Sequence, residues 1–269
     1  MEISYTFYMQ IMFKRIHGKQ RFSARKEVFE QLRVRASYER KLNLNLITKF
    51  AEIGKIARDE YLTRQQIGLS QASVANKINE VLEPHYRSVI EEFGLRVLRY
   101  RKQDSQFETI IREYYAVHGA LAVTNISNTT IRRLQQILLA KEAEALGVAA
   151  IAQEIFDSMR GSYSRYRSSV IARTETHNAA SFANHEIAKS LNLPDLQKQW
   201  VSVSDDRTRS NHAAMNGVRV PYDEDFDVPT DFGTVRMSRP SDPRGGAANV
   251  INCRCVLLYI TPEDEVEDT

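Results

Sequence analysis

The chain has 269 residues, of which 42% are hydrophobic and 26% are charged, and its formal net charge is +3. These values are ordinary for a soluble globular protein, with enough length for one large core or two modest ones. No apolar run approaches the roughly 20 residues of a membrane-spanning helix, and the N-terminus lacks a secretory pattern. We therefore expect no membrane partner and synthesis in the cytoplasm.

The cysteines and the charges restrict the class of protein further. Cys253 and Cys255 are the two cysteines of the chain, and a disulfide across one intervening residue would be strained, so we expect a reducing compartment. Residues 1–41 carry ten Lys and Arg against four Asp and Glu, whereas residues 222–269 carry four against eleven. This asymmetry permits nucleic-acid contact at the basic end, although a solvated helix face is the alternative interpretation.

Residues 22 to 191 have the pattern of helices. Apolar residues recur every three or four positions, glycines are few, and Pro84 stands alone among the prolines. The Ser and Thr cluster at 127–130 predicts the start of a helix that stops at Gly147. A second helix is predicted from residue 163 to 191, with Arg173 and His177 on one polar edge.

The residue pattern changes after Pro194. Trp200 and Val201 indicate a strand, and residues 250–260 are rich in β-forming side chains. The last nine residues carry five acids and no base, which predicts a flexible tail. The expected fold class is α+β and predominantly α-helical: a long N-terminal helical region followed by a small C-terminal α+β module, with a boundary near residue 195.

The common enzyme signatures are missing from the sequence. It has no internal repeat, no glycine-rich phosphate loop, no Gly-x-Ser-x-Gly elbow and no His-Glu-x-x-His pair. Any chemistry must therefore come from less familiar groupings of residues.

One such grouping joins a histidine to the two cysteines. Asp205 or Asp206 is placed to cap a short helix that carries His212 and ends before Gly217. In an alternating segment Cys253 and Cys255 point to the same face, together with Ile251, Leu257 and Tyr259. The cysteines are then either small buried hydrophobes or, with His212, three zinc ligands, with His177 or an aspartate as the fourth.

Three motifs in order carry a family resemblance. They are Arg173-Thr174-Glu175-Thr176, then Asp206-Arg207-Thr208-Arg209 with His212 and Gly217, then Asn252-Cys253-Arg254-Cys255. Together they resemble the phage Mu protein F-like head morphogenesis family. The resemblance covers about residues 125 to 260 and implies a head morphogenesis domain at 126–260. Around it we expect a helical N-terminal region at 1–125 that docks on the portal or another partner, and an acidic flexible tail at 261–269.

The same resemblance implies a function and partners. The chain is expected to be a phage or prophage minor head protein, a non-enzymatic capsid component that acts in head morphogenesis at the portal. The expected partners are the phage portal protein, then the scaffold or major capsid protein. The charge asymmetry, and not the resemblance, adds DNA as a partner through the basic N-terminal segment. The expected location is the virion interior near the portal, and the host cytoplasm during assembly.

The sequence also departs from the family pattern. Arg209 and His212 stand where relatives often carry a Cys-x-x-Cys pair, and Val250 stands where they carry a histidine. The carried-over metal candidates are therefore His212, Cys253 and Cys255, so that the chain binds either no cofactor or zinc.

The polar motif residues are expected to be structural. This set consists of Arg173, Glu175, His177, Asp206, Arg207, Arg209 and Arg254. Arg173 or Arg207 should bond to carboxylates or backbone carbonyls where helix and sheet meet. A nuclease- or transferase-like enzyme would instead need an open pocket formed by Arg173, Glu175, Asp206 and His212. A DNA-binding module would use the aromatic residues of the basic segment, namely Tyr5, Phe7, Tyr8, Phe13 and Phe22.

Overall fold

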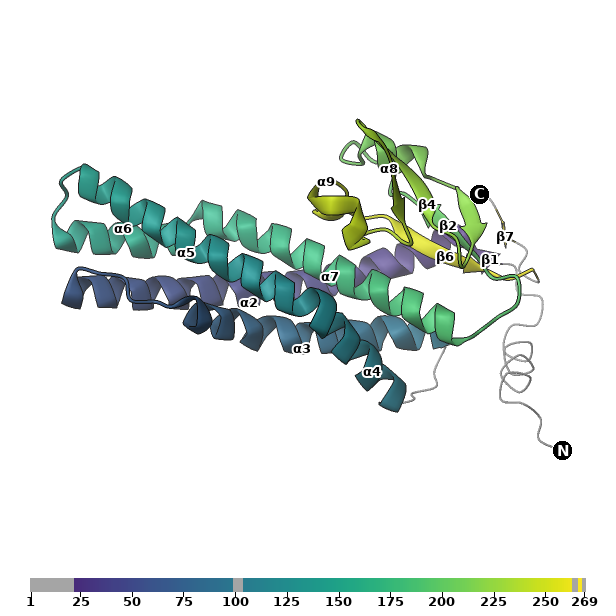
Figure 1. Ribbon diagram of the computed structural model, residues 1–269, viewed down its shortest axis with the longest axis horizontal. Helices are drawn as coiled ribbons and strands as arrows, with labels where there is room; N and C mark the ends of the chain where they lie inside the picture. Colours follow the sequence, from purple (N-terminus) through teal and green to yellow (C-terminus); the bar gives the residue numbers. More distant parts are fainter. Residues whose placement is uncertain (1–21, 99–103, 263–265, 268–269) are drawn as a thin grey trace. The chain divides into compact units, whose positions relative to one another are not determined.

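The computed structural model describes residues 22–98, 104–262 and 266–267 (Figure 1). The first 21 residues of the basic segment at 1–41, which include Tyr5, Phe7, Tyr8 and Phe13, lie outside the described residues. No helix of the described ranges is both long and apolar enough to span a membrane. The elements are β1 (Phe22–Ser23), α2 (Ala24–Arg64), α3 (Gln71–Leu98), α4 (Asp104–Tyr114), the π-helix η1 (Tyr115–Gly119), α5 (Ala120–Ala143), α6 (Val148–Arg160), α7 (Ser162–Ser190), β2 (Gln197–Val201), α8 (Ser210–Ala214), β3 (Arg219–Pro221), β4 (Phe226–Thr230), β5 (Gly233–Met237), the 3₁₀ turn η2 (Pro243–Gly245), α9 (Gly246–Val250), β6 (Val256–Ile260) and β7 (Val266–Glu267).

The order of elements confirms the predicted class, α+β and mostly α-helical. The chain divides into two compact units, each discontinuous in sequence. The helical unit consists of Ser37–Val89 and Glu108–Thr176, and the mixed unit consists of Met1–Ala36, Ile90–Phe107 and His177–Thr269. The change of residue pattern near residue 195 therefore marks the start of the first long strand, β2. The boundaries between the compact units lie elsewhere, within the helices α2, α3, α4 and α7.

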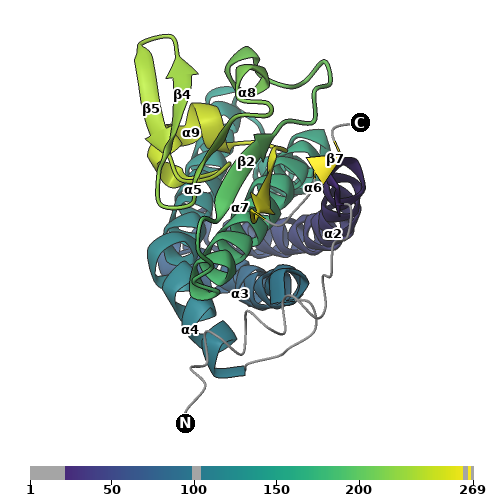
Figure 2. The same cartoon turned by 90° about the vertical axis from the view of Figure 1, so that its right-hand side faces the viewer.

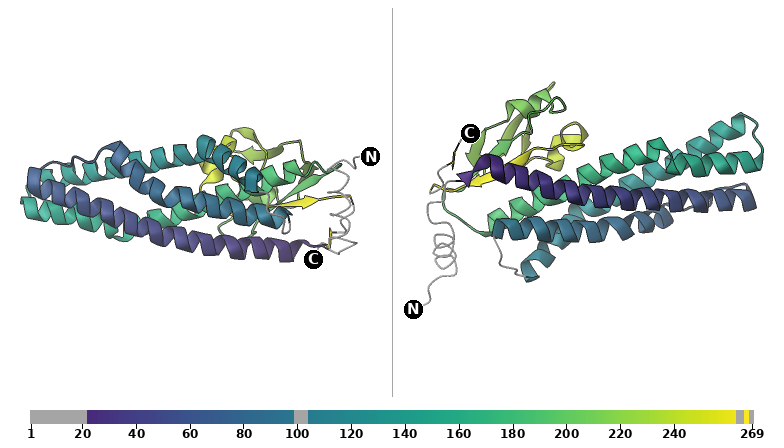
Figure 3. Two further views of the ribbon diagram at one scale, coloured as in Figure 1. Left: turned by 90° about the horizontal axis from the view of Figure 1, so that it is seen from below. Right: turned by 180° about the vertical axis from the view of Figure 1, so that it is seen from behind.

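The helical unit is built from apolar stripes. Along α2 the buried side chains recur at intervals of three and four residues, at Leu42, Leu46, Phe50, Ile53, Ala57 and Tyr61. On α3 the corresponding stripe contains Val74, Ile78, Leu82 and Tyr86. This spacing places each set on one helix face, which is buried against neighbouring helices. The parts of α2 and α3 in this unit lie side by side, joined by residues 65–70 (Figures 1 and 3).

A glycine inside α2 marks a close helix approach. A Cβ atom added at Gly54 would lie 2.5 Å from the Cβ of Met159 on α6. Glycine costs roughly 0.5–1 kcal/mol relative to alanine in a helix interior. The tight contact between α2 and α6 explains why the residue here has no side chain.

The predicted helix start at 127–130 is wrong, because these residues lie inside α5. The Ser127 hydroxyl donates to the Val123 carbonyl at 2.6 Å, and the Thr130 hydroxyl donates to the Ile126 carbonyl at 2.7 Å. Hydroxyl side chains can bond one turn back within a helix as well as cap its start. The helix ends at Ala143, and Gly147 is the N-cap of α6 rather than the stop.

The mixed unit contains the longer strands. In its antiparallel sheet β2 lies between β3 and β6, and Trp200 pairs with Leu257 across the β2 and β6 ladder. Strands β4 and β5 form a separate hairpin, seen next to α9 in Figure 2. Val266 and Glu267, in the tail expected to be flexible, form the short strand β7, which pairs in parallel with β1.

Candidate functional site

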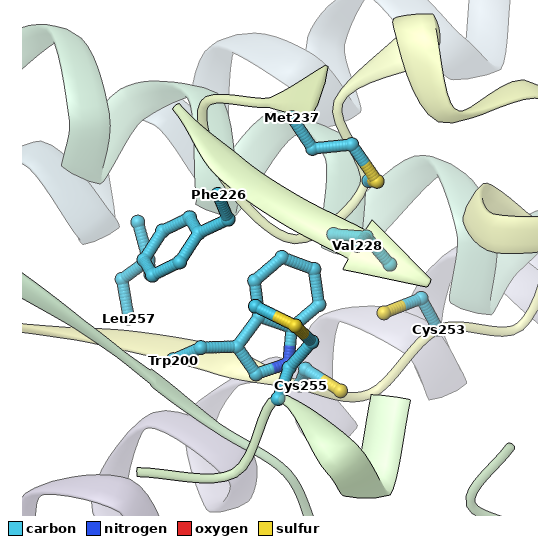
Figure 4. Close-up of a cluster of buried hydrophobic side chains, with 8 residues drawn as sticks. Trp200, Phe226, Val228, Met237, Cys253, Cys255 and Leu257 are labelled. Carbon is cyan, nitrogen blue, oxygen red and sulfur yellow. The ribbon is translucent and has the colours of Figure 1, made fainter. Parts of the chain in front are cut away.

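Strand β2 directs a lysine and a tryptophan into the mixed unit. Because side chains alternate along a strand, Lys198 and Trp200 share the inward face, and they are 1% and 0% exposed. Trp200 packs edge-on against Phe226, with ring centres 5.4 Å apart. Figure 4 shows the buried cluster around this indole, which also contains Met215, Val228, Met237, Cys253, Cys255 and Leu257.

The cysteines lie in a loop and not on the predicted strand. Strand β6 begins at Val256, after both cysteines, and α9 ends at Val250. Ile251, which was expected on the same face, is 41% exposed, whereas Cys253 and Cys255 are buried. The turn before Cys253, which the alternating pattern does not reveal, accounts for the difference.

His212 reaches the cysteines from α8. The predicted aspartate cap of this helix is wrong, because its N-cap is Arg209, without a side-chain bond. Asp205 instead accepts bonds from the Arg207 amide and the Thr208 hydroxyl in the preceding turn. His212 is 1% exposed, and its ring packs edge-on against Trp200 at 5.5 Å.

The three predicted metal ligands lie together. The His212 Nδ1 atom is 3.7 Å from the Cys253 sulfur and 3.5 Å from the Cys255 sulfur. The three atoms lie within 4.8 Å of one another, and among the described residues no further His, Cys, Asp or Glu joins them. The expected fourth ligand, His177 or an aspartate, is therefore not part of the group.

The two thiols differ in acidity because they interact with each other. A hydrogen bond from Cys255 lowers the pKa of Cys253, and His212 adds to this effect despite the opposing burial. The pKa of Cys255 is raised by the same bond and by burial. Cys253 is therefore the first of the two thiols to lose its proton. Its thiolate is the species that binds a soft metal ion or another electrophile.

Between the cysteines, Arg254 points to a carboxylate. Its two terminal nitrogens donate to the two oxygens of Asp205, each at 2.5 Å. This bond from Arg254 lowers the pKa of Asp205 well below its ordinary value. Arg207 adds a longer contact to Asp205 at 3.4 Å, whereas Asp206 is exposed. The carboxylate that binds Arg254 is therefore Asp205.

Two further arginines hold the backbone of the cysteine loop. Arg209 donates to the Ile251 carbonyl at 2.5 Å. Arg35, on α2, donates to the carbonyls of Arg254 at 2.8 Å and Cys255 at 3.5 Å. Sequence reasoning missed Arg35, because it lies in the basic segment interpreted as either a solvated helix face or a DNA contact, yet it is only 5% exposed.

Three other motif residues lie on α7. In the helical unit Arg173 is 3.8 Å from Glu39, so its carboxylate partner lies on the helix α2 of the same unit. In the mixed unit His177 bonds through Nδ1 to the Ser241 hydroxyl at 3.1 Å. Burial, with Arg35 and Arg239 nearby, lowers the pKa of His177 well below its ordinary value.

Glu175 is held in the helical unit by a tyrosine. The Tyr86 hydroxyl donates to its carboxylate at 2.7 Å. The carboxyl group is enclosed although the residue as a whole is only partly buried, and this burial raises the pKa of Glu175 to about 7 against the opposing Tyr86 bond.

Part of the chain that contains these residues matches a known protein family. Residues 127–258 match the family described as Phage Mu protein F like protein. This segment is Mu F-like. It runs from within α5 to within β6 and contains all the motif residues on which the resemblance was predicted.

Two relatives share part of this sequence. The chain is 31% identical over 137 residues to minor head protein GP7 of Bacillus phage SPP1, covering 49% of the chain and 40% of GP7. It is 29% identical over 114 residues to the uncharacterized protein YqbB of Bacillus subtilis strain 168, covering 39% of the chain and 37% of YqbB. The matched parts thus span about two fifths of these relatives. No solved structure matches the chain.

Arg167 is a structural residue of the Mu F-like segment that sequence reasoning missed. From α7 it donates to the Ile126 carbonyl at 2.8 Å and the Thr130 hydroxyl at 2.9 Å on α5. Its guanidinium also lies 4.7 Å from the Phe50 ring centre. The Ser and Thr cluster interpreted as a helix cap is therefore the docking point of this arginine.

The Mu F-like segment does not assemble the enzyme set within one unit. Arg173 and Glu175 belong to the helical unit, and Asp206 and His212 to the mixed unit. His212 is buried and the Glu175 carboxyl group is enclosed, whereas a general acid or base must reach a substrate.

Proposed function

We propose that the chain is a minor head protein of a phage or prophage, and that it acts in head morphogenesis by binding other head components without turnover. The match of residues 127–258 to the Mu F-like family carries this proposal, together with the name of GP7. The bonds made by Arg167, Arg209 and Arg254 support it, because these residues of the segment are engaged in holding the fold.

The proposed partner is the portal protein inside the head, with the scaffold or major capsid protein as further candidates. The helical unit presents two large apolar side chains one turn apart, Val117 on η1 and Leu121 on α5, which are 63% and 58% exposed. A π-helix such as η1 is rare and frequent at functional sites. We assign portal docking to this portal face, defined as Val117 and Leu121.

The test uses a phage defective in this gene, complemented with the full chain or its variants. Val117→Glu with Leu121→Glu should lower the copies per head about tenfold or more, measured by quantitative mass spectrometry, because buried charge opposes docking. Leu44→Glu is the matched control, since Leu44 is 64% exposed on α2 of the same unit. Equal incorporation of the portal-face variant and the control would overturn the assignment.

Glu175→Gln tests the proposed lack of turnover in the same heads. The variant should be incorporated and should support infection as wild type does, because glutamine can still accept the Tyr86 bond. Normal incorporation and stability with lost infectivity would favour catalysis instead.

DNA contact is assigned to the basic segment at 1–41. Replacing Lys14, Arg15, Lys19 and Arg21 by Gln should reduce the salt dependence of DNA binding, by roughly 0.9 in log–log slope for each phosphate that the segment no longer neutralises. Arg132, Lys189, Arg207 and Arg236 are exposed, so replacing these four by Gln changes net charge equally and serves as the control. An equal effect of both variants would contradict a specific role of the segment.

A further inference from the structure

The histidine and cysteine cluster brings three soft donors into one buried place. His212 comes from α8 and the cysteines from the loop before β6, about forty residues later in the chain. All three are buried, and their ligand atoms lie within 4.8 Å of one another. Packing alone requires only small apolar side chains here, and it does not explain why a nitrogen and two sulfurs face one point.

We propose that His212 Nδ1, Cys253 Sγ and Cys255 Sγ bind one thiophilic divalent ion of the zinc class. Zinc bonds are about 2.3 Å to sulfur and 2.0–2.1 Å to nitrogen, so ligands at a tetrahedral angle lie about 3.5–3.6 Å apart. The two nitrogen-to-sulfur distances are 3.7 and 3.5 Å. The ion therefore fits between these donors with small side-chain rotations.

The surroundings suit a charged metal–thiolate group. On binding, each thiol loses its proton to solvent, and the neutral imidazole gives its Nδ1 lone pair, so two thiolates balance the two charges of the ion. Arg35 donates to the carbonyls of Arg254 and Cys255, which places a cation beside the thiolates. The fourth position falls to water or an exogenous ligand, since no other described His, Cys, Asp or Glu lies in the group.

Plain thiol-to-imidazole hydrogen bonding is the alternative explanation of the same distances. It leaves the cluster as an ordinary part of the core around Trp200. With Nδ1 facing the sulfurs, the buried Nε2 of His212 has no hydrogen-bond partner among the described residues. The unpartnered Nε2 is compatible with both explanations. Only a measurement of metal binding distinguishes them.

The decisive experiment measures metal binding by the full chain. Chelator-treated, reduced protein is titrated with Co²⁺ and Zn²⁺, and zinc is also counted in freshly purified protein. One equivalent should bind, and the Co²⁺ form should show thiolate charge-transfer absorption, which only Cys253 and Cys255 can supply in this chain. Absence of stoichiometric binding, or a Co²⁺ spectrum without thiolate bands, would overturn the proposal.

Variants assign the ligands. Cys253→Ser, Cys255→Ser and His212→Gln should each weaken Zn²⁺ binding about a hundredfold or more, whereas His185→Gln should leave it unchanged. His185 is the matched control, because it is a largely buried histidine of the same unit, bonded to Tyr222. Zn²⁺ should also raise the melting temperature of wild type. This shift in melting temperature is measured on wild type and so does not depend on whether the variants fold. If Zn²⁺ does not raise the melting temperature of wild type, the ion is not structural. Unchanged affinity in all three ligand variants would place the metal elsewhere.

Discussion

The helical unit and the mixed unit use their charged side chains differently. In the helical unit the core is formed by apolar stripes, such as the one from Leu42 to Tyr61 on α2. In the mixed unit several cations are buried and donate to backbone carbonyls: Arg35 to Cys255, and Lys198 to Ser238 at 2.9 Å. The helical unit has a comparable contact, from the partly buried Arg167 to the Ile126 carbonyl, so the two units differ in how far they rely on such bonds.

Backbone hydrogen bonding explains the difference. A helix satisfies most of its own amides and carbonyls, so helices pack mainly through apolar faces. The mixed unit has strands of at most five residues among its described elements, and its loops leave carbonyls without partners in a ladder. Long basic side chains supply these donors while their carbon stems pack against the core.

Lys198 shows what such burial does to a charge. It lies 5.4 and 5.5 Å from the ring centres of Tyr222 and Phe226. Burial lowers the pKa of Lys198 to about 8, despite the opposing attraction of Asp225. With this pKa the Lys198 side chain is still mostly protonated at neutral pH. Its bond to the Ser238 carbonyl and its contacts with the two rings offset part of the cost of removing the ammonium group from water.

Trp200→Ala should produce the largest effect and should affect the mixed unit alone. Removing this fully buried side chain should lower the free energy of unfolding by about 3–5 kcal/mol, because a large cavity remains. Urea denaturation gives the magnitude, and hydrogen exchange shows where protection is lost. Leu139→Ala, at a residue 67% exposed on α5, is the control and should change stability little. Equal loss of protection in both units would break the distinction between them.

Glu175→Gln tests an enclosed carboxylate of the helical unit. The pKa of Glu175 is raised to about 7 from an ordinary 4.5, so the folded state holds this proton more tightly than the unfolded state. The protonated Glu175 therefore contributes up to about 3 kcal/mol to the free energy of unfolding. This contribution is fully present below pH 4.5 and is lost as the pH rises through 7. The variant should remove this loss between pH 5 and 8 in denaturation series. Glu113→Gln, at an exposed carboxylate of the same unit, is the matched control variant in these series. A variant that keeps the wild-type slope would show that another group titrates.

Local patterns in the sequence predicted the helices well, because their periodicity is set by each segment itself. The helix predicted at 163–191 is α7, Ser162–Ser190. The start of α5 was missed because Ser127 and Thr130 make the same kind of bond inside a helix as at its cap. The β-rich segment predicted at 250–260 begins six residues before strand β6, because residues 251–255 alternate like a strand although they form a turn and a loop.

The cluster of His212, Cys253 and Cys255 followed from residue chemistry and order in the chain, and the structure places these residues together. The partners of the arginines did not follow. Arg35 lies about 220 residues before the carbonyls that it binds, and no local signal connects such distant positions. Two adjacent aspartates also look alike in sequence, and only the turn at Asp205 selects the one that Arg254 binds.

Arg254→Lys should have the smallest effect and tests whether arginine geometry matters in the mixed unit. Lysine keeps the charge but cannot bond both oxygens of Asp205, so the melting temperature should fall by about 2–4 °C. Arg207→Lys is the control, because Arg207 is 70% exposed and makes only a longer contact to the same carboxylate. The pKa of Asp205 is lowered by Arg254, so this stabilisation is present above its ordinary value of 3.8 and is lost as the pH falls below it. The difference between wild type and Arg254→Lys should therefore be full at pH 7 and shrink on acidification. A difference that persists unchanged in acid would mean that the arginine acts through packing and not through this ion pair.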